Sequence, residues 1–90
     1  MNIENLNKIA NELISELKSD EHILSIDLYK EDSKILVHYY GIKKLAAELG
    51  KDAICDCTIE NVWVPNECDK ANRYYFDIDN IRFFGIEYEK

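Results

Sequence analysis

Glycine and proline are scarce in this chain, with three glycines and one proline among 90 residues. Collagen-like and low-complexity chains are rich in these residues, and disordered chains are poor in aromatics, whereas this chain has six tyrosines, three phenylalanines and one tryptophan. Long apolar runs are also missing, so we expect neither a membrane-spanning helix nor a secretory signal. With 47% hydrophobic content, the sequence predicts one globular domain over 1–90.

Basic residues are few as well. Eleven Lys and Arg stand against 18 Asp and Glu, which gives a formal net charge of −7. A strongly acidic chain is repelled by nucleic acid and by anionic lipid, and it is attracted to basic protein surfaces. We therefore expect a partner with a basic protein surface, and no direct nucleic-acid or membrane partner.

The cysteines are Cys55, Cys57 and Cys68. An odd number of cysteines, in a chain where no export signal is expected, fits a reducing compartment better than a disulfide scaffold. The predicted location is the cytoplasm.

A zinc site could draw on these cysteines and on the two histidines. Structural zinc ligands usually come from tight turns, whereas Cys55 and Cys57 are predicted to lie on one face of a strand together with Ile59 and Trp63. This pattern is more typical of small buried hydrophobic side chains. No metal site is predicted, although metal or redox chemistry of the cysteines is kept as an alternative.

Catalytic motifs are missing too. Nucleophilic catalysis needs a serine or cysteine together with a histidine and an orienting carboxylate, and neither His22 nor His38 lies next to a glycine-rich elbow. The glycines Gly41, Gly50 and Gly85 are isolated, so they form no phosphate-binding loop. We expect no enzymatic activity and no cofactor.

The N-terminal segment Asn2–Lys18 has apolar residues at spacings of three and four, with charged residues between them. This pattern predicts an amphipathic helix, with Asn2 or Asn5 as its cap and its apolar stripe laid across a sheet. The apolar residues are Ile3, Leu6, Ile9, Ala10, Leu13, Ile14 and Leu17.

The next two segments have the period of two that is typical of strands, and the segment after them returns to helical spacing. Ile23–Tyr29 and Lys34–Tyr40 predict an antiparallel hairpin, whose second strand is apolar on both faces and so is expected in the middle of the sheet. Ile42–Leu49 has helical spacing, and Gly50 suits a left-handed helix stop.

Three more strands are predicted in the rest of the chain: Ala53–Val64, Asn72–Ile78 and Ile81–Tyr88. Asp79 and Asn80 form a two-residue turn between the last two strands, and Gly85 predicts a β-bulge. The predicted fold is α+β: the N-terminal amphipathic helix packs on a largely antiparallel sheet of about five strands, with a short second helix between the second and third strands.

Acidic residues gather between Asp52 and Asp69, a segment with five acids and no base. If the third and fourth strands pair, one plausible register places Glu60 opposite Asp77, and like charges that face each other destabilise a sheet. Such an acidic array imitates a phosphate backbone, and tyrosine adds an interface anchor. A solvated face that only keeps the protein soluble is the alternative. The predicted partner-binding residues are Asp56, Glu60, Glu67, Asp69, Tyr75, Asp77 and Asp79.

The short acidic chain, rich in lysine and isoleucine and with aromatic strands around Asp52–Asp79, resembles small phage- or mobile-element-encoded inhibitors of bacterial defence, the anti-CRISPR type. The resemblance lies in composition over the whole chain and assigns no functional residue. It implies a non-enzymatic inhibitor that binds a CRISPR effector or another nuclease in the host cytoplasm, some such inhibitors being nucleic-acid mimics. An immunity-type or antitoxin-like protein that neutralises a basic toxin is the alternative.

Overall fold

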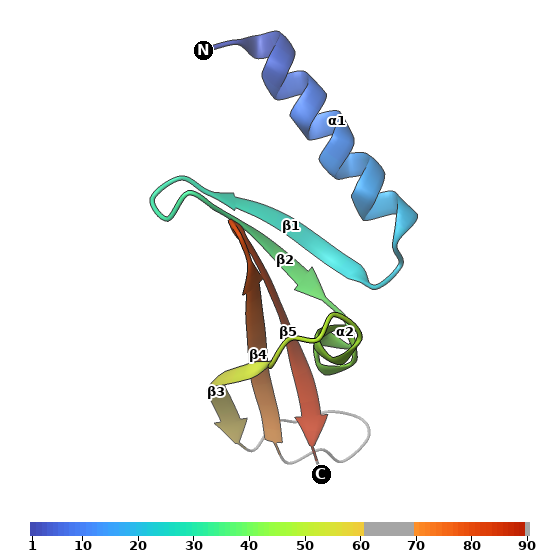
Figure 1. Ribbon diagram of the computed structural model, residues 1–90, viewed down its shortest axis with the longest axis vertical. Helices are drawn as coiled ribbons and strands as arrows, with labels where there is room; N and C mark the ends of the chain where they lie inside the picture. The colour runs from blue at the N-terminus through green and yellow to red at the C-terminus, as the bar shows by residue number, and fades with distance from the viewer. Residues whose placement is uncertain (61–69, 90) are drawn as a thin grey trace.

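The computed structural model describes residues 1–60 and 70–89. Over these residues the chain forms a helix, two strands, a second helix and three strands (Figure 1). The predicted α+β class, with an N-terminal helix, a short second helix and a mostly antiparallel sheet, is confirmed. The elements are α1 (Ile3–Ser19), β1 (Ile23–Tyr29), β2 (Lys34–Tyr39), α2 (Ile42–Glu48), β3 (Ile54–Glu60), β4 (Lys70–Ile78) and β5 (Ile81–Glu89).

The five described strands form one sheet in the order β1-β2-β5-β4-β3. The β1–β2 hairpin and the β4–β5 hairpin are antiparallel, as predicted, and Asp79 and Asn80 form the turn of the second. The strand β2 lies between β1 and β5, which confirms its expected place inside the sheet. It pairs with β5 in parallel, and this pair joins the first half of the chain to the last strand.

The helix α2 packs on one face of the sheet, against β4 and β5. Its residues Ile42 and Ala46 are 0% and 1% exposed, and Phe76 of β4 completes the buried cluster beside them. The predicted bulge at Gly85 is wrong, because the β4–β5 register runs through this residue without a shift. Glycine is needed there for another reason: a Cβ would lie 2.9 Å from the Cβ of Ile42. Partly buried residues around the cluster are Tyr39, Leu45, Ala53, Tyr74, Ile78 and Phe83.

Backbone geometry and one side chain fix the ends of α2. At its start, the backbone N–H of Lys43 donates to Glu87 Oε1 of β5 at 3.3 Å. At its end, Gly50 has φ +67° and the N–H of Lys51 donates to the carbonyl of Ala46 at 2.8 Å. This is the left-handed helix stop that the sequence predicts.

The helix α1 is present with the predicted cap, since the N–H of Asn5 donates to Asn2 Oδ1 at 3.1 Å. The prediction that it lies across the sheet is wrong: none of its residues is buried among the described residues. The three-residue connection 20–22 leads straight into the edge strand β1, and α2 already occupies one face of the sheet. The helix therefore runs past the edge of the sheet, and its distance from β1 increases toward the N-terminus of α1 (Figure 1).

The strand β3 contains a bulge that the sequence does not reveal. Cys55 pairs with Tyr74 and Cys57 pairs with Arg73, so Asp56 is an extra residue in the ladder. A bulge breaks the period of two and moves the following residues to the other face. The two cysteines therefore lie on opposite faces, and both are exposed. The prediction that they are buried on one face is wrong. Trp63, Cys68 and the rest of the predicted third strand beyond residue 60 lie outside the described residues.

Candidate functional site

The sheet face opposite α2 gathers most of the predicted site residues that the structure describes. Alternate residues of β4 and β5 point to this side, and their register places Tyr75 beside Phe84 and Asp77 beside Arg82. The strand β2 continues the same face, because its Leu36 pairs with Arg82. We call this surface the Arg–Tyr face. Its residues are Tyr29, Lys34, Leu36, Asp56, Arg73, Tyr75, Asp77, Arg82 and Phe84.

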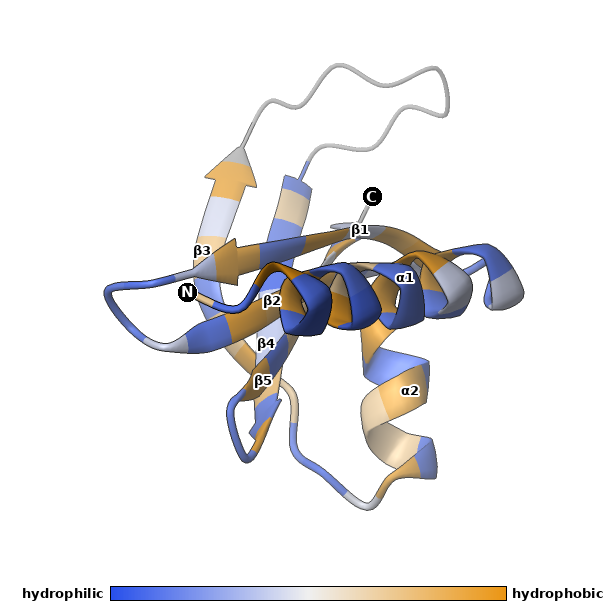
Figure 2. Ribbon diagram, turned by 90° about the horizontal axis from the view of Figure 1, so that it is seen from above, coloured by the Kyte–Doolittle hydropathy of each residue, from blue (hydrophilic) through white to orange (hydrophobic). Residues whose placement is uncertain are grey.

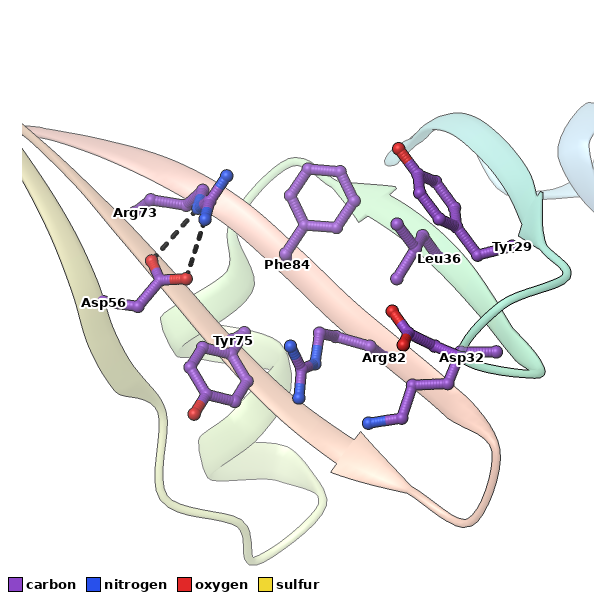
Figure 3. A pocket seen from close by; sticks show the side chains of 9 residues that line it. Tyr29, Asp32, Leu36, Asp56, Arg73, Tyr75, Arg82 and Phe84 are labelled. Carbon is purple, nitrogen blue, oxygen red and sulfur yellow. Dashed lines mark hydrogen bonds and ion pairs between the residues drawn. The ribbon is translucent and has the colours of Figure 1, made fainter.

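A shallow cavity of about 550 Å³ lies on this face (Figure 3). Tyr75 and Phe84 stand side by side on β4 and β5, and Leu36 of β2 continues this apolar surface. Charged side chains from β3, β4 and β5 flank the aromatic rings (Figure 3). The cavity thus combines an apolar floor with a few fixed polar groups, as is typical of binding sites.

The first fixed group is the pair of Asp56 and Arg73. Arg73 donates from Nε and Nη2 to the two carboxylate oxygens of Asp56, at 3.0 and 2.8 Å. The bulge in β3 places Asp56 opposite this guanidinium. The hydrogen bonds from Arg73 lower the pKa of Asp56, and those to Asp56 raise the pKa of Arg73. Such bidentate ion pairs hold both side chains in one orientation.

The second group joins three strands. Arg82 of β5 donates from Nε and Nη2 to Asp77 of β4 at 2.8 and 3.1 Å, and Lys34 of β2 lies 3.4 Å from the same carboxylate. Hydrogen bonds from Arg82 are the main cause of the lowered pKa of Asp77. The guanidinium of Arg82 also lies 4.3 Å from the centre of the Tyr75 ring, a cation–π contact.

The predicted site residues are therefore only partly brought together. Asp56, Tyr75 and Asp77 share the Arg–Tyr face, whereas Asp79 lies in the turn after β4 and is exposed. The register that places Glu60 opposite Asp77 is wrong. Lys70 faces Glu60 in the β3–β4 ladder, and Arg82 faces Asp77 across β4 and β5. Glu67 and Asp69 lie outside the described residues.

The sequence reasoning missed the basic half of this face. Arg73 and Arg82 carry the ion pairs, and Phe84 forms the floor beside Tyr75. A signal for one pair was present, because a two-residue turn at 79–80 fixes the hairpin register and puts Arg82 opposite Asp77. No feature of the sequence indicates the bulge that places Asp56 beside Arg73.

The histidines take part in stacking and turn contacts. His38 stacks on Phe84 with 4.8 Å between ring centroids. His22 lies in the turn after α1, where its backbone N–H and its Nδ1 both contact Asp20 Oδ1, at 2.9 and 3.3 Å. Among the described residues, no hydrogen bond joins either ring to a serine, threonine or cysteine, and no His, Cys, Asp or Glu group is arranged to hold a metal ion.

No family model, curated protein or solved structure matches this chain. Of the two helices in the described part of the chain, neither has the length and apolar content needed to cross a membrane.

Proposed function

We propose that this chain is a non-enzymatic protein-binding inhibitor that engages a basic surface of a nucleic-acid-handling protein through the Arg–Tyr face. The observation that carries the proposal is the contact of Arg82 with both Asp77 and the Tyr75 ring at the edge of the cavity. Tyrosine and arginine are enriched at interface hot spots. Side chains already held in place lose little freedom on binding, which leaves more of the contact energy for affinity.

Charge supports a basic partner. On the Arg–Tyr face the guanidinium groups of Arg73 and Arg82 are each held by a carboxylate. Lys34 adds a positive charge and Asp32 at the cavity adds a negative one, so the face is close to neutral. The attraction to a basic surface therefore comes from the net charge of the whole chain, −7. A net field of this sign speeds the encounter with a basic protein and adds salt dependence to it.

Single-stranded nucleic acid is the competing ligand, because aromatic and arginine side chains on a sheet also form stacking platforms for bases. In such platforms the arginine side chains bind the phosphate groups of the nucleic acid. Here both arginines already donate two hydrogen bonds to carboxylates, at 2.8 to 3.1 Å. The acidic chain also repels phosphates over a long range. A protein partner fits these facts better.

The target class follows from charge and from the resemblance to anti-defence inhibitors: a nuclease complex of bacterial defence, such as a CRISPR effector. A basic toxin neutralised in the manner of an immunity protein would use the same face and is an outcome of the test below. A metal- or redox-based role is less favoured, since the bulge turns Cys55 and Cys57 to opposite faces of β3.

The test compares the parent protein with Tyr75→Ala and with Tyr40→Ala as a matched control. Tyr40 is 66% exposed and does not line the cavity of the Arg–Tyr face. Each protein is immobilised and exposed to nuclease-treated bacterial lysate at low and at physiological salt, and the captured proteins are quantified by mass spectrometry. The affinity of the main captured protein is then measured after purification.

We expect the parent and Tyr40→Ala to capture a basic nucleic-acid-handling protein, with affinity reduced at least about tenfold in Tyr75→Ala. Capture should weaken as salt rises. Equal capture by all three proteins would contradict the proposal, and so would specific binding of purified single-stranded nucleic acid. A captured basic toxin would assign the immunity-type role instead.

A further inference from the structure

The helix α1 exposes most of its apolar stripe, of which only Leu13 is partly buried among the described residues. Ile3 is 62% exposed, and Leu6, Ile9 and Ile14 are each 47% to 49% exposed. In Figure 2 the ribbon of α1 changes repeatedly between hydrophobic and hydrophilic residues along its length. A helix of this length is only marginally stable in water without packing of its apolar side. The described residues leave most of this stripe uncovered, so a partner that covers it would stabilise the helix.

The spacing of the stripe is that of a helix pair. Ile3, Leu6, Ala10, Leu13 and Leu17 follow one another at intervals of three and four residues. This is the a and d pattern of a heptad over more than two repeats. Two further apolar residues widen the stripe at its flanks, namely Ile9 and Ile14.

The stripe is complementary to itself in one antiparallel register, which is centred between residues 11 and 12. In this register Leu6 lies level with Leu17 of the second copy, Ile9 with Ile14, and Ala10 with Leu13, so that a small residue meets a large one. We propose that α1 packs against α1 of a second copy of this chain in this register, and that the protein is an antiparallel helix-paired homodimer. Such a pair has the two-fold symmetry of most homodimers.

The charged residues of α1 are compatible with this register. With Ile3 at position a of the heptad, Glu4, Lys8, Glu12 and Lys18 lie at positions b, f, c and b, on the side of the helix away from a partner. Glu16 lies at a flanking g position, and the residue of the second copy level with it is neutral. In the proposed register Glu4, Lys8, Glu12, Glu16 and Lys18 lie level with Ser19, Ser15, Asn11, Asn7 and Asn5, respectively.

The area is sufficient for a specific interface. Apolar side chains that are about half exposed over the stripe amount to about 1,000 Å² for two copies, which meets the lower bound for a specific interface. Pairing would also add to a small core, whose buried apolar residues among the described residues are Val37, Ile42, Ala46, Ala71 and Phe76. Association that buries more apolar surface stabilises the folded state.

The test measures the oligomeric state by sedimentation equilibrium over a wide range of concentrations. The chain mass is 10.6 kDa. The variants are Leu6→Lys, Leu17→Glu and an equimolar mixture of the two, with Ser15→Glu as a control that adds a charge to the polar side of α1. Near-UV circular dichroism of the sheet aromatics checks that each variant keeps its sheet, to which α1 contributes no buried residue.

We expect the parent and Ser15→Glu to sediment with twice the chain mass, and each single variant with the chain mass. The mixture should recover the dimer, because the antiparallel register places the substituted position of Leu6→Lys beside the substituted position of Leu17→Glu. Opposite charges then meet at one end of the helix pair, and an unchanged leucine pair remains at the other end.

A parent that is monomeric at every concentration would overturn the proposal, whether or not it binds lipid vesicles. A mixture that stays monomeric with intact sheets would overturn the antiparallel pairing. None of these outcomes depends on the Arg–Tyr face, whose cavity α1 does not line.

Discussion

Arg82 and Asp77 face each other across β4 and β5, and the guanidinium donates to both carboxylate oxygens at 2.8 and 3.1 Å. The same guanidinium contacts the Tyr75 ring, so one arginine connects an ion pair to the floor of the cavity. Because the three side chains restrain one another, the surface is ordered before any partner arrives. This relationship also makes the stability of the domain dependent on pH.

Asp77→Asn tests that dependence. Hydrogen bonds from Arg82 hold the pKa of Asp77 below its ordinary value. The stabilisation is therefore fully present above the ordinary carboxyl pKa of about 3.9, and it is lost as the pH falls through the lower pKa of the folded state. We expect the variant to lose about 1 kcal/mol of unfolding free energy at neutral pH, and the difference from the parent to vanish in strong acid.

The measurement for Asp77 is urea unfolding from neutral to acidic pH, with Asp79→Asn as the control. Asp79 is exposed in the neighbouring turn, so this variant removes the same charge without breaking the pair with Arg82. A loss at neutral pH that is the same in both variants would contradict a specific role of the pair.

Gly85→Ala should be strongly destabilising, by about 2 to 4 kcal/mol. The new methyl group would lie 2.9 Å from Ile42 Cβ and against the backbone of Tyr39, in the tightest part of the core. Gly50→Ala is the matched control, because its Cβ meets open space and only its φ of +67° is unfavourable. Thermal unfolding should rank the two variants in this order, and equal losses would contradict the close packing of α2.

Asp79→Gly should be neutral or stabilising. Asp79 has φ +51°, a conformation that glycine adopts without the strain of a side chain. Against this, glycine adds freedom to the unfolded chain, so the expected gain is at most about 1 kcal/mol. The melting temperature measures the change, and a clear loss of stability would contradict the turn conformation.

The thiols of Cys55 and Cys57 should react in the native protein. Both residues are exposed, one on each face of β3. Modification with a maleimide, followed by peptide mass spectrometry, should label both within minutes without denaturant. The double variant Cys55→Ser, Cys57→Ser should melt close to the parent. Protection of either thiol until urea is added would contradict the bulge.

The elements that could be predicted are those with a local cause. The hairpin of β1 and β2 follows from the period of two and from a polar turn, and the end of α2 follows from Gly50. The packing of α1 was predicted wrongly because an apolar stripe records that a helix needs a partner, but not which surface provides it. The parallel pair of β2 and β5 has no local signal, since its strands are separated by more than forty residues.

In the candidate site, too, features with a local cause could be predicted and features that depend on distant contacts could not. Tyr75 and Asp77 could be placed on one strand face by alternation alone. The acidic residues were interpreted as a free charge array because the sequence does not tell which strands are neighbours. Once β5 lies beside β4, Arg82 meets Asp77, and once β3 bulges, Arg73 meets Asp56. The extra residue in the ladder is a tertiary feature that single-sequence periodicity does not contain.

The parallel contact between β2 and β5 divides the assembly of the domain into two stages. The hairpin of β1 and β2 and the meander of β3, β4 and β5 each close between neighbouring segments, whereas the sheet becomes continuous only when the last strand reaches β2. On the ribosome this step has to wait until β5 has emerged, because a distant contact cannot form before its second strand exists. Until then the edge of β2 is free to pair with other chains, so the nascent protein stays exposed to edge-to-edge aggregation until β5 docks.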